Sequence, residues 1–66
     1  MRKDTIIFDD LYLGNKFKSC GATFIRTETV FDEFGIQLEA VCIDSPNKDE
    51  IGRLYSFDND LEVERI

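Results

Sequence analysis

The stretch IQLEAVCID, residues 36–44, decides how this sequence folds. Its residues at positions 36, 38, 40 and 42 are apolar or small, and a period of two places them on one face of a β-strand. Gln37 and Glu39 face the other way, whereas Val41 and Ile43 make the second half apolar on both faces, as in a strand that enters a closed barrel. A helix is the competing interpretation. The β-branched content and the short length favour a strand.

Similar short segments surround this strand, because glycines and Pro46 divide the chain into pieces rich in β-branched and aromatic residues. Strands are expected at residues 16–18, 22–29, 36–44, 51–57 and 61–66. Turns are expected at residues 14–15, 19–21, 45–50 and 58–60, and a loop at residues 31–35 in which Gly35 takes a positive φ. The expected inward side chains include Phe17, Leu61 and Val63. This spacing is typical of an all-β fold, and it predicts a small five-stranded antiparallel barrel.

The barrel domain is expected to span residues 14–66, and residues 1–13 are expected to form an irregular N-terminal arm that packs on it. Ile6, Ile7, Leu11 and Leu13 supply apolar contacts for an arm of this kind, which could include one helical turn.

Composition excludes several kinds of chemistry. The chain has 66 residues, a net charge of -6, no histidine, no tryptophan and two cysteines. Without histidine it cannot form a serine or cysteine catalytic triad or an imidazole metal site. Residues 58–62 superficially resemble a calcium loop but lack the glycine and glutamate that an EF-hand needs. We therefore predict no catalytic residue, no metal, no cofactor and no enzymatic activity.

Hydropathy and cysteine content predict a cytoplasmic protein. No apolar run approaches the length that crosses a bilayer, and the first residues do not form a signal-peptide pattern. Cys20 and Cys42 are accordingly expected to be free thiols. A chain this short buries a modest share of its surface, so a homodimer that shares burial remains an open alternative.

Charge is divided unevenly along the chain. Residues 1–27 carry five basic and three acidic side chains, whereas residues 28–66 carry three basic and eleven acidic ones. An acidic face of this kind either docks on a basic protein surface or serves solubility. The carboxylates proposed for partner binding are Asp49, Glu50, Asp58, Asp60, Glu62 and Glu64.

Two aromatic residues, Phe31 and Phe34, flank the acidic pair Asp32 and Glu33. They either pack back on the barrel mouth as a lid or anchor a protein interface that has an acidic rim. Both are included among the candidate partner-binding residues.

Nucleic-acid binding is a common role of small barrels, which stack bases on aromatic side chains across a basic face. A small version of such a face would combine Lys16, Lys18, Arg26 and Arg53 with Phe24 or Tyr55. However, a chain of net charge -6 repels polyphosphate, and direct nucleic-acid binding is therefore disfavoured.

From residue 10 onward a recurring pattern of core and turn residues is present. It comprises Leu11, Gly14, Phe17, residues 23–27, Ala40, Val41, Gly52, residues 55–57 and Val63. With this pattern the chain resembles small SH3-like β-barrel proteins, many of them encoded by bacteriophages. The resemblance implies an SH3-like fold and a phage or mobile-element origin. It carries no catalytic residues across.

The expected function is protein binding without catalysis. In its most concrete form, a phage or mobile-element accessory protein in the host cytoplasm binds a basic surface of a host protein and inhibits it. A defence nuclease inhibited in the manner of anti-CRISPR proteins is one example. A structural or self-assembling virion barrel and a nucleic-acid-binding adaptor are the alternatives.

Overall fold

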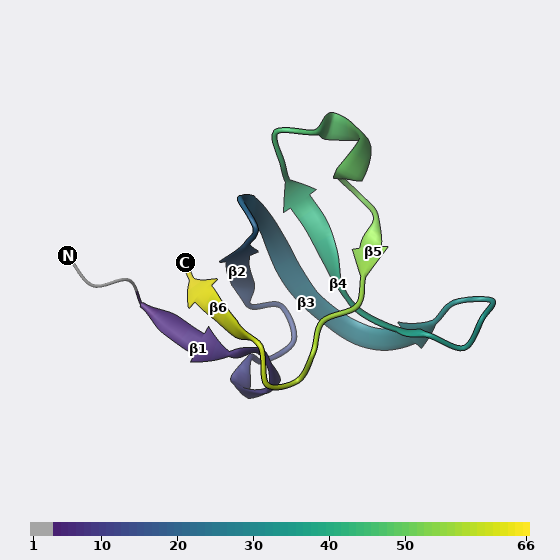
Figure 1. Cartoon of the computed structure of the whole chain (residues 1–66), viewed down its shortest axis with the longest axis horizontal. Coiled ribbons are helices and arrows are strands. Elements are labelled where there is room, and N and C mark those ends of the chain that lie inside the picture. Colours follow the sequence, from purple (N-terminus) through teal and green to yellow (C-terminus); the bar gives the residue numbers. More distant parts are fainter. Residues whose placement is uncertain (1–3) are drawn as a thin grey trace.

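The described part of the chain folds into one antiparallel β-sheet of six strands, in the order β1-β6-β2-β3-β4-β5 (Figure 1). The computed structural model describes residues 4–66. The strands are β1 (Thr5–Ile7), β2 (Lys16–Ser19), β3 (Ala22–Phe31), β4 (Gln37–Asp44), β5 (Leu54–Tyr55) and β6 (Glu62–Arg65). Single turns of 3-10 helix, η1 (Phe8–Asp10) and η2 (Lys48–Glu50), follow β1 and precede β5.

The all-β prediction is confirmed, but two parts of it need correction. The sheet has six strands rather than five, and its pairing is not closed, because β1 and β5 form the two edges. The sixth strand is β1, which comes from the segment predicted to be an irregular arm. Ile6 lies opposite Val63 in the β1–β6 pair, and this pairing brings the arm into the sheet. Residues 1–3 of the predicted arm lie outside the described residues.

The predicted strands are otherwise found with shifted ends. β3 continues to Phe31, two residues beyond its predicted end. β5 shrinks to Leu54–Tyr55, because the turn at η2 and the positive φ of Gly52 (89°) leave Ile51 in the loop. Leu61, predicted to point inward, lies before β6 and is exposed.

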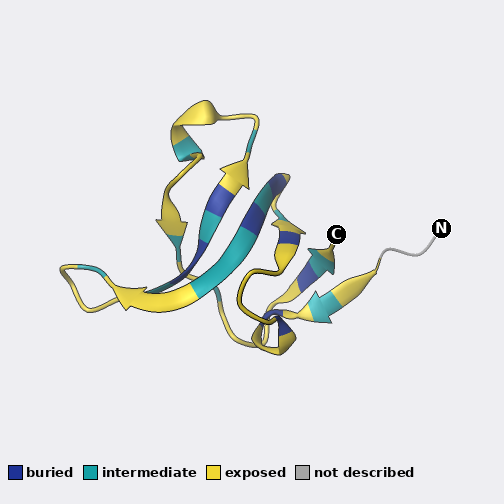
Figure 2. Cartoon of the chain, turned by 180° about the vertical axis from the view of Figure 1, so that it is seen from behind, coloured by how far each residue is buried: buried dark blue, intermediate teal, exposed yellow. Residues whose placement is uncertain are grey.

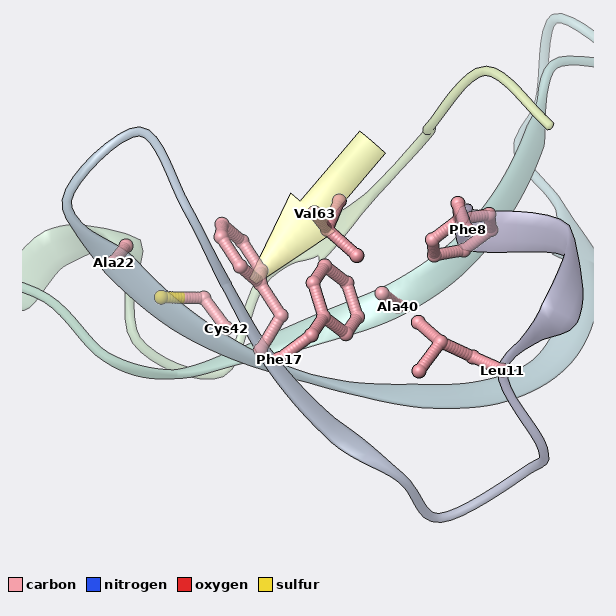
Figure 3. Packing of buried hydrophobic residues seen from close by; sticks show 8 residues of the cluster. Phe8, Leu11, Phe17, Ala22, Ala40, Cys42 and Val63 are labelled. Atoms are coloured by element: carbon pink, nitrogen blue, oxygen red, sulfur yellow. The ribbon is translucent and has the colours of Figure 1, made fainter. Parts of the chain in front are cut away.

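The core is built around four phenylalanines. Phe8, Phe17, Phe24 and Phe57 make stacked and edge-on contacts with ring centroids 5.1–5.5 Å apart. Phe17 points inward, as predicted, and is completely buried. Small and aliphatic side chains complete the cluster, namely Leu11, Ala22, Ala40, Cys42 and Val63 (Figure 3). Each buried ring contributes about 1.5–3 kcal/mol through removal of apolar surface from water, so this cluster is the main source of stability.

Arg26 of β3 fastens the N-terminal turn to the core. Its Nη1 donates hydrogen bonds to the carbonyl oxygens of Phe8 (2.8 Å) and Leu11 (2.7 Å). Its guanidinium carbon lies 4.7 Å from the centroid of the Phe8 ring, a cation–π contact. The Phe8 N–H donates to the Leu61 carbonyl at 2.8 Å, which holds the same turn from the other side.

The β2–β3 hairpin turns in two residues, Cys20 and Gly21, with φ angles of 52° and 80°. Two successive positive φ angles between paired strands match a type I′ turn, whose twist suits an antiparallel hairpin. Cys20 is exposed and Cys42 is buried, and both are free.

Glu39 departs from the expected surface pattern of β4. It was predicted to face away from the apolar row, yet it is 6% exposed, and among residues 4–66 no other charged side chain is buried. The β3–β4 register shifts between Arg26 and Val30, so residues 27–29 of β3 lie opposite Glu39 alone. The extra residues of a bulge bend the strand locally and interrupt the regular alternation beside Glu39.

Candidate protein-binding hairpin

The β3–β4 hairpin extends beyond the rest of the sheet. Ladder pairing of β2 with β3 ends at Ile25, and β5 pairs with β4 only at Ala40 and Val41. Residues 27–39, called the distal hairpin below, therefore form a two-stranded ribbon that projects from the body (Figure 1). The projection accounts for much of the elongated shape of 42 × 26 × 17 Å.

The distal hairpin exposes the two phenylalanines that the core does not use. Phe31 is 63% exposed and Phe34 is 80% exposed. Val30 and Ile36, on either side of the loop, are exposed too, and Figure 2 shows the ribbon as largely exposed. The interpretation of Phe31 and Phe34 as a lid on the body is therefore wrong, because the hairpin carries both away from it.

The loop that carries Phe34 is held in place by hydrogen bonds. The Asp32 Oδ1 accepts from the N–H of Phe34 (2.8 Å) and of Ile36 (2.9 Å). The Asp32 N–H donates to the Ile36 carbonyl, and the Gly35 N–H donates to the Asp32 carbonyl, each at 3.1 Å. Gly35 has a φ of 79°, which confirms the positive φ predicted for it. The exposed aromatic side chain thus stands on an ordered turn, and less conformational entropy is lost when a partner covers it.

The hairpin is strongly acidic. Residues 27–39 contain four acidic side chains and no basic one. Glu28 and Glu33 are exposed, while Asp32 is half-buried because its carboxylate closes the turn. The aromatic tip consequently has an acidic surround, and this favours association with positively charged surfaces.

The carboxylates proposed from the sequence lie on three different segments. Glu62 and Glu64 share one face of β6, as predicted, and Glu64 lies opposite Lys18 of β2. Asp58 and Asp60 are in the loop between β5 and β6. Asp49 and Glu50 are on η2, beside the other edge of the sheet, and the Glu50 carboxylate accepts a hydrogen bond from the Ser45 hydroxyl at 3.0 Å. The structure therefore distributes the six carboxylates as three pairs over these three segments.

The residues considered for nucleic-acid binding are not assembled into a basic stacking surface. Phe24 is buried in the core, and Arg26 donates its hydrogen bonds to backbone carbonyls. Lys16 and Lys18 are exposed on β2, and Lys18 lies opposite Glu64 of β6.

Concave sites are shallow. One depression of about 290 Å³ has Phe24, Tyr55 and Phe57 in its lining, with Cys20 and Glu50 beside them. Within the part of the chain that the structure describes, no three Cys, Asp or Glu side chains are grouped so that they could hold a metal ion. None of the helices formed by residues 4–66 is long and apolar enough to span a membrane.

Comparisons of the chain with known family models, with curated proteins and with solved structures find no match.

Proposed function

We propose that this chain is a non-enzymatic protein-binding module that docks its distal hairpin on a basic surface of another protein. The observation that carries the proposal is the separation of the phenylalanines. Four form the core, whereas Phe31 and Phe34 stand exposed on an ordered acidic loop. Buried aromatic anchors surrounded by polar residues are the usual source of affinity at protein interfaces.

The two aromatic side chains are large enough to matter for affinity. Full burial of a phenylalanine contributes about 1.5–3 kcal/mol, and Phe31 and Phe34 are 63% and 80% exposed. Their burial by a partner would contribute about 2–4 kcal/mol together, which corresponds to roughly thirtyfold to a thousandfold in affinity. The carboxylates of the hairpin and of β6 add long-range attraction to a basic partner, and they make association sensitive to salt.

The identity that we propose for the module is a phage or mobile-element accessory protein that inhibits a host protein in the cytoplasm. A defence nuclease is a suitable target, because a nucleic-acid channel is basic and an acidic hairpin would occupy the place of phosphates. The short, acidic chain and its resemblance to SH3-like barrel proteins support this version. An SH3-like fold belongs to the same proposal in an open form, without closure of the barrel, and the antiparallel sheet around one aromatic core supports it.

Affinity capture with matched variants tests the proposal. The tagged chain and its Phe31→Ser/Phe34→Ser variant are incubated with host lysate. A Tyr12→Ser/Leu13→Ser variant is the control, since Tyr12 and Leu13 are 80% and 58% exposed elsewhere on the molecule. We expect the wild type and the control to retain one basic protein that raised salt releases, and the tip variant to lose it. Retention of the same protein by the tip variant would refute the hairpin as the contact.

Charge reversal separates the hairpin from the C-terminal carboxylates. Glu28→Lys/Glu33→Lys changes the hairpin, and Asp60→Lys/Glu62→Lys changes β6 and the loop before it. Asp32 is left intact because its carboxylate holds the turn. The first pair is expected to weaken capture more than the second, and the reverse result would move the interface to β6.

A stable homo-oligomer without a partner would favour the assembly alternative, and a mobility shift of RNA or DNA at physiological salt would favour the adaptor.

A further inference from the structure

The distal hairpin has unpaired backbone on both of its long edges. Within the part of the chain that the structure describes, no strand pairing or backbone hydrogen bond connects residues 27–31 of β3 to a neighbour other than β4 and the tip loop. The same holds for residues 37–39 of β4 on the side where β5 would continue. Open edges of this kind are templates on which another chain can add a strand.

The two edges differ in regularity. On β3, the register shift between Arg26 and Val30 inserts extra residues into the strand. A bulge of this kind disrupts the ladder and twists the edge, and bulges are a usual protection against strand addition. On β4, the N–H of Cys42 donates to Arg53 and its carbonyl accepts from Gly52, so the Cys42 backbone faces the β5 side. The period of two then turns the N–H and C=O of Leu38 toward the open edge of β4.

The face next to this edge is apolar and uncovered. Val30 lies directly opposite Leu38, and Ile36 lies two residues from Leu38 on the same face of the hairpin. This row continues the buried positions Ala40 and Cys42 beyond the end of the core, which leaves Ile36 and Val30 exposed and Leu38 half-buried. An added strand would cover these side chains with alternate side chains of its own.

We propose that the open edge of β4 at Leu38, beside the exposed side chains of Val30 and Ile36, accepts an extended segment of the partner as an additional strand, in line with β5, and that this segment carries lysine or arginine among β-branched residues. The inference rests on the proposed function, since it specifies how the hairpin engages its basic partner. Charge complementarity selects the occupant, because residues 27–39 hold four acidic and no basic side chains. A second copy of this chain would bring acidic hairpins together, and like charges at an interface oppose association.

A peptide titration tests the strand-addition site. The probe is a short synthetic peptide that alternates lysine with isoleucine or valine, added to the uniformly ¹⁵N-labelled full chain. One control peptide is N-methylated at alternate residues, which keeps its charge and removes backbone donors. A second control replaces lysine by glutamate. We expect the first peptide to shift the amide resonances of residues 36–39 and to slow exchange of the Leu38 amide. The N-methylated peptide should bind at least about tenfold more weakly, and the acidic peptide should not bind.

Several results would overturn the strand-addition site. The N-methylated peptide could bind as tightly as the first peptide, or the lysine peptide could fail to bind. The amide shifts could be confined to Glu62 and Glu64 of β6. Sedimentation could also show that the chain dimerises and that the dimer itself slows exchange of the Leu38 amide. The Ile36→Thr variant should bind the lysine peptide more weakly than the wild type does. The Ile51→Thr variant, changed at an exposed position in the turn before β5, should bind it as tightly as the wild type. These results are independent of partner capture. If the tip variant still loses its partner while no peptide binds, the strand-addition site fails and the proposed function stands. If the peptide binds at residues 36–39 while the Phe31→Ser/Phe34→Ser variant captures the same partner as the wild type, the proposed function fails.

Discussion

Replacement of Arg26 by methionine tests how the N-terminal turn is held. The change keeps an unbranched side chain for packing but removes hydrogen bonds of 2.8 and 2.7 Å to the Phe8 and Leu11 carbonyls and the cation–π contact with Phe8. A hydrogen bond from a charged group contributes about 1.5–3 kcal/mol when buried. Arg26 is half-buried, so we take about 1 kcal/mol for each bond and about 0.5 kcal/mol for the ring contact. The expected loss is about 2–3 kcal/mol.

A loss of this size is large for so small a domain. At about 0.05–0.15 kcal/mol per residue, a chain of 66 residues has about 3–10 kcal/mol of stability in total. The melting temperature should fall by about 10–20 °C, since each kcal/mol shifts a domain of this size by about 4–8 °C. Circular dichroism during heating and urea titration measures both quantities. Arg26→Lys should recover part of the loss because a lysine can donate to one of the carbonyls.

The matched control for this prediction is Arg53→Met, at an exposed arginine in the turn before β5. It should change the free energy of unfolding by about 0.5 kcal/mol or less, as surface substitutions usually do. A difference of 2–3 °C in melting temperature corresponds to roughly half a kcal/mol. If Arg26→Met and Arg53→Met melted within that range of each other, the proposed role of Arg26 in stabilising the N-terminal turn would be refuted.

Four further predictions concern the core, the turns and the thiols. Phe17→Ala should unfold the chain or cost about 3–5 kcal/mol in urea titration, because Phe17 is completely buried among aromatic rings. Asp32→Ala should lower the ¹⁵N order parameters of the tip loop while the sheet stays folded, and Asp32→Asn, which keeps the Oδ1 acceptor, should not. Cys20→Asn should raise stability by about 0.5–1 kcal/mol, since asparagine suits the first position of a type I′ turn. In the wild type a thiol reagent should modify exposed Cys20 at once and buried Cys42 only on unfolding.

Local pattern was sufficient to predict the three central strands. The alternation in residues 36–44, the inward Phe17 and the turn glycines each depend on neighbours in sequence, and β2, β3 and β4 follow from them. β1 could not be predicted in this way, because Ile6 enters the sheet through Val63 near the other end of the chain. The same reason explains Arg26, whose basic side chain suggested phosphate binding until the fold placed two carbonyl oxygens beside it.

The candidate site was predicted in part. The spacing of Phe31 and Phe34 around two carboxylates indicated either a lid or an anchor, and the sequence could not separate the two. The outcome depends on how far β3 and β4 extend past β2 and β5, and the length of β5 is set by a 3-10 turn and Gly52 that alternation does not reveal. Likewise, Glu62 and Glu64 were correctly placed on one face of β6, whereas the positions of Asp49 and Asp58 relative to them depend on the order of strands in the sheet.

The measurement that tests the protein-binding hairpin most directly is the dissociation constant of the purified partner for the Phe31→Ser/Phe34→Ser chain, obtained by titration calorimetry beside the Tyr12→Ser/Leu13→Ser control. Burial of the exposed parts of the two rings predicts a loss of about thirtyfold or more in the tip variant and about threefold or less in the control. A tip variant that binds as tightly as the wild type would contradict the account.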